Sequence, residues 1–180
     1  VRAALIAMML ANLGLLAAYA GQMRHHREAH WYLFVAGALC WLVGNAVLWR
    51  TFLVPAATPW WIAFIRLTIV GERLELTRYL PVPAWAKGLL WLVLAAFVAG
   101  VLLPFHGPGP QVLGVASVAA ALWLMRYDMA RIGVRKADFH RYVAVGLLVG
   151  YGWLLLNGLV LLFGGAQPLF YDLYLHTFFL

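Results

Sequence analysis

Charged residues are scarce in this chain. Only 11% of its 180 residues are Asp, Glu, Lys or Arg, whereas 66% are hydrophobic and the mean hydropathy is +0.88. Several apolar stretches reach about 20 residues, the length that an α-helix needs to cross a bilayer. These stretches are continuous rather than alternating, which excludes a β-barrel. The composition therefore predicts an all-α fold, a polytopic transmembrane helical bundle.

The chain also lacks the patterns of common enzymes and metal sites. Its single cysteine, Cys40, excludes an internal disulfide. Walker A, GxGxxG, HExxH, GxSxG and CxxC sequences are absent. His26 and His30 are four residues apart, which suits a metal on a helix, but they lie in a short basic turn that favours tethering at the membrane interface. No metal site is predicted, and without a long linker, residues 1–180 are expected to form a single transmembrane domain.

Six apolar stretches are long enough to be spanning helices, and proline- or glycine-rich breaks separate them. The breaks include Pro55 with Pro59, Pro81 with Pro83, and the stretch 106–110. A seventh helix is expected to start after Pro168, too short here to span, which predicts that a longer polypeptide continues past this sequence. The six predicted helices cover residues 3–23, 31–49, 60–80, 88–105, 112–129 and 143–163.

The net charge of +7 is unevenly distributed along the chain. Ten of the 13 Lys and Arg residues lie at the ends of the first, third and fifth predicted helices or in the segments that follow them, on one side of the membrane. Basic loops of membrane proteins lie in the cytoplasm, so the N-terminus is expected outside. Because no basic soluble surface is present, the predicted partner is the lipid bilayer and not a nucleic acid. The ten residues are Arg24, Arg27, Arg73, Arg78, Lys87, Arg126, Arg131, Arg135, Lys136 and Arg141.

The stretch GERLELTR at 71–78 places charges within the inner half of the third predicted helix. An ionised group at mid-membrane costs about 2.5–3.5 kcal/mol, so several of them require partners inside the protein. We expect Glu72, Arg73, Glu75 and Arg78 to form a buried ion-pair cluster. The predicted partners of the glutamates are basic groups on the first or fifth helix, or Arg78. The alternatives are an ion or proton path and a helix end at the interface.

Two short sequence patterns recur along the chain and suggest an internal repeat of four helices. An acid-x-His-x-Tyr pattern occurs at 28–32 and again at 138–142, and Trp-x-x-x-Asn occurs at 41–45 and at 153–157. The offset is 110 residues at the histidines and 112 at the asparagines. An offset of four helices keeps the same direction through the bilayer, which predicts a parallel repeat. Chance similarity is the alternative, because Trp and Tyr are common in this chain.

Small and amide side chains within these helices predict close packing. Asn45 and Asn157 are expected to form hydrogen bonds between helices. Gly146 and Gly150 form a GxxxG pair, which is typical of a helix that another helix approaches closely.

One histidine is a candidate cofactor ligand. His176 lies one to two turns into the seventh predicted helix, and Asp172 lies four residues before it on the same face. Imidazole binds haem iron or copper, and a hydrogen-bonding partner fixes its tautomer. Arg66 lies near the outer end of the third helix and could bind a haem propionate or Asp172. The alternative is a His–Asp hydrogen bond at the interface.

The possible four-helix repeat, together with LYLHTFFL around His176, resembles the large subunit of haem–copper oxidases and the related-looking NnrS family. The resemblance implies about twelve helices, of which this chain would match the first half, in a bacterial cytoplasmic membrane. It also implies haem as cofactor and a role in respiratory or nitric-oxide-related chemistry, with other membrane subunits or the remainder of the chain as partners. The midplane histidines of the oxidases are not found here. The alternatives are a structural accessory subunit and a small-solute or ion transporter.

Overall fold

The computed structural model describes residues 2–26, 28–105, 107–165 and 169–179, and all regular structure in these ranges is helical. The chain divides into two compact units, Val1–Glu75 and Leu76–Leu180. Three positions that entered the sequence-based expectations, Arg27, His106 and Pro168, lie outside the described residues. The all-α prediction is confirmed.

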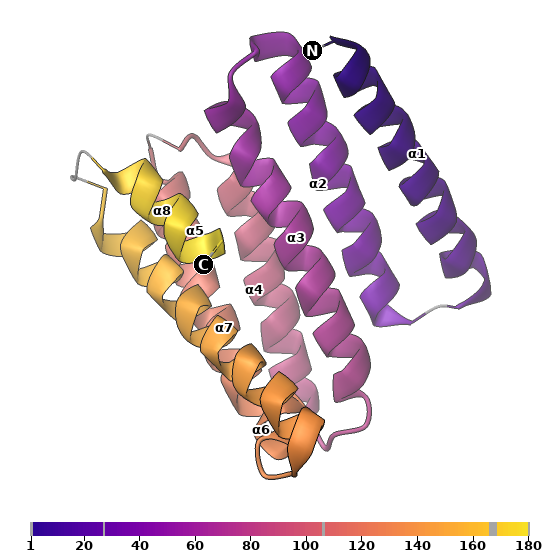
Figure 1. Cartoon of the computed structure of the whole chain (residues 1–180), viewed down its shortest axis with the longest axis vertical. Coiled ribbons are helices and arrows are strands. Elements are labelled where there is room, and N and C mark those ends of the chain that lie inside the picture. Colours follow the sequence, from indigo (N-terminus) through magenta and orange to yellow (C-terminus); the bar gives the residue numbers. More distant parts are fainter. Residues whose placement is uncertain (1, 27, 106, 166–168, 180) are drawn as a thin grey trace. The chain divides into compact units, whose positions relative to one another are not determined.

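The first unit is built from three long helices, α1 (Arg2–His25), α2 (Ala29–Thr51) and α3, which begins at Val54 and continues to Thr77, just past the end of the unit. α1 packs alongside α2 (Figure 1). The fully buried Asn12 ties the two together, because its Nδ2 donates a hydrogen bond to the Ala38 carbonyl at 3.2 Å.

The turn between α2 and α3 is short, because α2 ends at Thr51 and α3 begins at Val54. Phe52 adopts the left-handed conformation, with φ of 52°, and its N–H closes the end of α2 on the Leu48 carbonyl. The predicted break at Pro55 and Pro59 was placed too far along, because α3 already begins at Val54 and contains Pro59. Pro55 lies in the first turn of α3, where proline is tolerated because no intrahelical N–H bond is required, whereas Pro59 lies inside the helix and removes one such bond. The Thr58 hydroxyl also donates to the Val54 carbonyl at 3.0 Å, beside the bond that Pro59 cannot make.

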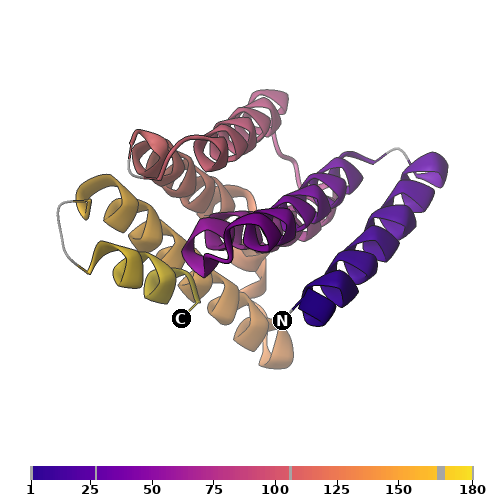
Figure 2. The ribbon, with the colours of Figure 1, turned by 90° about the horizontal axis from the view of Figure 1, so that it is seen from above.

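The second unit centres on α5 (Gly109–Tyr127), which packs against α4 (Ala84–Leu102) and α7 (Asp138–Phe163). Figure 2 shows α4 and α5 side by side. The four-residue helix α6 (Ala130–Gly133), which the sequence did not predict, links α5 to α7, and α8 (Phe170–Phe179) packs against α7. The helix expected after Pro168 is therefore present as α8, which has ten residues.

Close helix contact in the second unit occurs at a glycine pair that the sequence reasoning did not select. A Cβ added at Gly158 would meet the Val118 main-chain nitrogen at 2.8 Å and the Gly114 oxygen at 3.0 Å. Gly146 and Gly150 are exposed, with no heavy atom of the described chain within 4 Å of an added Cβ. The expectation that these two pack closely was wrong for the described helices, because that face of α7 turns away from α5.

Among the described residues, five helices are long and apolar enough to cross a membrane, namely α1, α2, α3, α4 and α7. The fifth predicted helix forms as α5 but falls outside this group, since Gln111 and Arg126 make its ends polar.

Candidate functional site

A buried histidine opens α2. Glu28 precedes the helix in an extended conformation, and His30 lies in the first turn with only 5% of its surface exposed. The imidazole is held by aromatic neighbours, with ring centroids 5.2 Å from Trp31 and 5.5 Å from Phe34. This packing orients both ring nitrogens towards polar groups instead of leaving the ring free to rotate.

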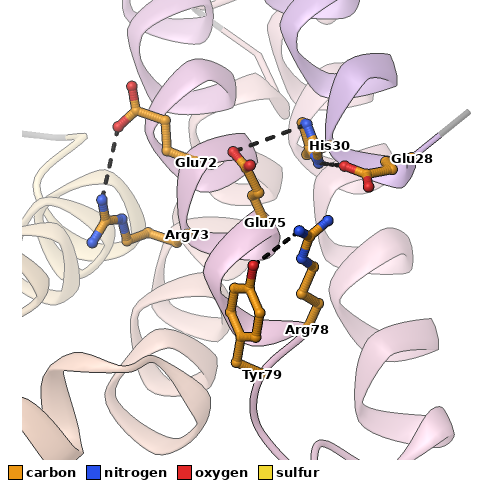
Figure 3. Close-up of polar contacts among 7 residues, drawn as sticks. All are labelled: Glu28, His30, Glu72, Arg73, Glu75, Arg78 and Tyr79. Carbon is orange, nitrogen blue, oxygen red and sulfur yellow. Dashed lines mark hydrogen bonds and ion pairs between the residues drawn. The ribbon is translucent and has the colours of Figure 1, made fainter. Parts of the chain in front are cut away.

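Two carboxylates face the two sides of this ring. Nδ1 of His30 lies 3.6 Å from Oε2 of Glu28, and Nε2 lies 4.0 Å from Oε2 of Glu75. Glu75 comes from the far end of α3 and points towards α2 (Figure 3). We call Glu28, His30 and Glu75 the His30 cluster. One ligand atom from each of the three residues lies within 4.8 Å of the others.

The His30 cluster can bind a cation in one of two ways. A protonated imidazole would form an ion pair with both carboxylates. A neutral imidazole and two carboxylates also provide three ligands for a divalent transition metal, with bonds of about 2.0–2.2 Å that place ligand atoms roughly 3.4 Å apart. Both glutamate side chains are 45% exposed, so each has room to rotate the short distance that metal binding requires.

Of the other residues of the predicted ion-pair cluster, Glu72 and Arg78 are exposed, whereas the Arg73 side chain is only 18% exposed. Glu72 lies 3.9 Å from its neighbour Arg73, and its side chain is 56% exposed. Arg78 is exposed and donates to the Tyr79 hydroxyl at 2.9 Å (Figure 3). Both glutamates lie within 4.0 Å of a basic nitrogen, the usual limit for an ion pair. For Glu75 that nitrogen belongs to His30 of α2, a residue that the sequence reasoning had assigned only to the interface.

The two asparagines form the predicted hydrogen bonds between helices. Oδ1 of Asn45 accepts from the Trp61 indole at 3.1 Å, which joins α2 to α3. Nδ2 of Asn157 donates to the Tyr174 carbonyl and to the Thr177 hydroxyl, both at 2.9 Å, which joins α7 to α8. Both asparagines are fully buried.

The predicted cofactor ligands lie in different units. Arg66 is buried in the first unit, whereas Asp172 and His176 are exposed on α8 of the second. Nδ1 of His176 bonds at 2.8 Å to the main-chain oxygen of Asp172 and not to its carboxylate. Within the described residues the His176 ring is exposed, and its link to Asp172 runs through the backbone.

Over residues 1–180 the chain matches the model of a family described as a domain of unknown function (DUF8744). The chain belongs to this family. No curated protein and no solved structure matches it.

In this DUF8744 chain, the contact between His30 and Glu75 was not predicted from the sequence. A signal for it existed, because the positive-inside assignment places the start of the second helix and the end of the third at the same membrane face. The carboxylate of Asp128 was also missed. It is 1% exposed, and one of its oxygens accepts from the Ala130 N–H at 2.8 Å.

Proposed function

We propose that this chain is an integral membrane helical domain of a bacterial cytoplasmic membrane, with its N-terminus outside. Five apolar helices of sufficient length support the proposal, as do large apolar side chains exposed along them, such as Leu10, Leu92 and Val149. The lipid bilayer covers this apolar surface, and other membrane subunits or a longer polypeptide cover part of it.

A single cysteine at Ala137 tests this orientation. Ala137 is exposed between α6 and α7, and a Cys40→Ala background removes the single thiol of residues 1–180. We expect an impermeant maleimide to label Ala137→Cys only in permeabilised cells. Leu53→Cys, in the exposed turn between α2 and α3, is the matched control and should label in intact cells. The reverse pattern would contradict the orientation.

Within this membrane domain, we infer that the His30 cluster binds a divalent transition-metal ion, such as Zn²⁺ or Mn²⁺. One observation carries this inference: a buried, packed imidazole with a carboxylate near each ring nitrogen. Two carboxylates balance the charge of a divalent ion, and three protein ligands leave positions open for water or a substrate. Because half-exposed carboxylates can move, the site accepts the ion without rearranging the helices.

Calorimetric titration of the purified, metal-free protein tests the site. We expect one binding event that His30→Ala or Glu75→Gln weakens at least about tenfold, by analogy with the loss of a metal-site partner. Glu72→Gln removes a neighbouring carboxylate, and a His25→Ala/His26→Ala double variant removes nearby exposed imidazoles. Both controls should retain binding. If Glu72→Gln weakens binding as much as Glu75→Gln, the ion is attracted by general charge and the proposal fails.

A second candidate is haem-type respiratory or nitric-oxide-related chemistry, and the geometry of His176 favours it. The Nδ1–H of His176 is occupied by the Asp172 carbonyl, so its Nε2 is an acceptor on an exposed ring. This is the tautomer that a haem ligand needs. The haem pocket would then be completed by groups outside the described residues.

An absorption spectrum separates the two candidates. Haem binding predicts a Soret band in the protein purified from membranes, which His176→Ala should abolish and His140→Ala, at another exposed histidine, should leave unchanged. A spectrum without this band, or one that His176→Ala does not alter, would remove the haem candidate and leave the metal site unaffected.

A further inference from the structure

The second unit contains a small cavity at one end of its helices. It has a volume of about 260 Å³ and lies between the turn that follows α3 and the segment joining α5 to α6. Leu80 and Ile132 contribute apolar walls, and three arginines contribute charge. A volume just below the usual range of about 300–1,000 Å³ for ligand pockets suits a small polar group and not a nucleotide. The three arginines are Arg126, Arg131 and Arg135.

A buried carboxylate also lines this cavity. Asp128 is 1% exposed, and Oδ1 accepts the Ala130 N–H at the start of α6. Oδ2 is buried and has no hydrogen-bond partner among the described residues. Leaving such an acceptor unsatisfied is energetically costly, and such exceptions in native proteins require an explanation. A bound group that donates a hydrogen bond would remove this cost.

The arginines do not supply that donor. In the part of the chain that the structure describes, no ion pair within 4.0 Å joins Asp128 to Arg126, Arg131 or Arg135. The Arg131 guanidinium instead lies 3.5 Å from the Arg126 carbonyl, and Arg126 stacks over the Tyr127 ring at 5.1 Å. Three guanidinium groups and one carboxylate leave two positive charges in excess around the cavity. The site therefore combines an excess of positive charge with one buried acceptor.

We propose that this cavity binds a phospholipid headgroup whose phosphate faces the three arginines and whose hydroxyl or ammonium group donates to Asp128. Arginine recognises phosphate through paired, charge-assisted hydrogen bonds. Basic pockets at the cytoplasmic ends of membrane helices are typical lipid headgroup sites. The choice of a lipid rests on the proposed membrane embedding, and the site is independent of the His30 cluster.

Two zwitterionic lipids separate the role of Asp128 from that of charge. Phosphatidylethanolamine and phosphatidylcholine carry the same net charge, but only the former has N–H donors. Native mass spectrometry of the full chain in detergent, with lipids of identical acyl chains, measures each affinity. We expect phosphatidylethanolamine and phosphatidylglycerol to bind at least about fivefold more tightly than phosphatidylcholine, the value of one hydrogen-bond-sized contribution near 1 kcal/mol.

Variants assign the effect to the cavity. Asp128→Asn keeps an oxygen for the Ala130 N–H but presents an amide to the cavity, so the preference for phosphatidylethanolamine over phosphatidylcholine should vanish. Asp128→Ser serves the same purpose if the first variant does not fold. Arg135→Gln should weaken phosphatidylglycerol binding about fivefold, whereas Lys136→Gln, at an adjacent exposed residue outside the lining, should not.

Three results would overturn the proposal. Equal binding of phosphatidylethanolamine and phosphatidylcholine by the wild type would remove the role of Asp128. An equal loss in Lys136→Gln and Arg135→Gln would reduce the effect to surface charge. Thermal stabilisation by inorganic phosphate or glycerol 1-phosphate as large as that by phosphatidylglycerol would show a site for soluble phosphates in place of a lipid site.

Discussion

The α2–α3 pair of the first unit and the α7–α8 pair of the second use the same short pattern in different ways. In each pair a Trp-x-x-x-Asn sequence ends in a fully buried asparagine that bonds to the helix that follows it. Asn45 accepts one indole N–H, and its Nδ2 has no partner among the described residues. Asn157 donates to two groups of α8. The shared pattern therefore joins two helices through a buried asparagine, and the number of hydrogen bonds it forms depends on the partner helix.

The histidines in the first turn of α2 and of α7 differ more strongly in their burial and in their neighbours. His30 is buried against Glu28 and Glu75, whereas His140, at the corresponding place in the second acid-x-His-x-Tyr pattern, is exposed. The pattern alone does not create a site. A cluster forms in the first unit because α3 brings Glu75 back to the start of α2. Whether the two pairs descend from one repeat stays a prediction.

The largest difference is expected between two glycines at which helices of the same unit pack closely, Gly158 in the second unit and Gly44 in the first. Gly158→Ala should destabilise the protein by about 3 kcal/mol, because the added methyl group meets main-chain atoms of α5 that cannot move away separately. Gly44→Ala in the first unit should cost about 1 kcal/mol, because the atoms nearest to its methyl group are side-chain atoms, those of the Trp61 ring and Trp60 Cβ, and not main-chain atoms of α3. Unfolding free energies in mixed detergent measure both.

A third glycine is the control for this comparison. Gly150→Ala introduces the same methyl group on α7, where nothing lies within 4 Å, and should leave the protein at least as stable. A loss at Gly150 comparable to that at Gly158 would mean that helix contacts outside the described arrangement determine the stability of α7.

The second difference concerns the two histidines. His30→Ala should lower the unfolding free energy by about 2 kcal/mol, because it leaves a cavity beside Trp31 and Phe34 and removes the partner of two carboxylates. His140→Ala should have almost no effect, since its side chain is exposed. Thermal unfolding in the presence of a chelator keeps metal binding out of the measurement. Similar losses at both positions would contradict the distinction drawn between the two units.

Much of the fold was predictable from the sequence because length and hydrophobicity act locally. Every apolar stretch formed a helix, and breaks at Pro81 and Pro83 fell where proline prevents helix continuation. Pro59 did not separate two helices. The effect of a proline depends on where the helix begins, and a single residue type does not determine where α3 begins. Gly146 and Gly150 failed because a GxxxG sequence does not say which helix, if any, faces it.

The candidate site was harder to predict than the helices. Glu75 was identified as a charge that needs a partner, but its partner is 45 positions away in sequence, at His30. Such pairs depend on the rotation of two helices about their axes, and the nearly uniform hydrophobicity of α2 provides little information about that rotation. Asp128 was missed for a related reason, because its burial depends on α6, which is too short to show a hydrophobic period.

A smaller difference is expected between the two asparagines. Asn157→Leu removes two hydrogen bonds to α8 and should cost about 1–1.5 kcal/mol, within the range for bonds between membrane helices. Asn45→Leu removes one bond to Trp61 but also removes an unsatisfied Nδ2, so its cost should be less than about half as large. Unfolding in mixed detergent measures both. Equal costs would show that the shared pattern, and not the number of bonds, sets the stability.

The smallest effect concerns the ion pairs at the end of α3. A double-mutant cycle with Glu75→Gln and His30→Ala should give a coupling energy of about 0.5 kcal/mol in metal-free protein, because half-exposed pairs are weak. The same cycle with Glu72→Gln and Arg73→Gln should give a value near zero, since adjacent helical residues do not face each other and Glu72 is mostly exposed. Raising the salt concentration from about 0.05 to 0.5 M should reduce the first coupling and leave the second unchanged. If the Glu72–Arg73 coupling equals or exceeds that of Glu75 with His30, the polar centre of the first unit lies on α3 alone, and the link between α2 and α3 through His30 has to be abandoned.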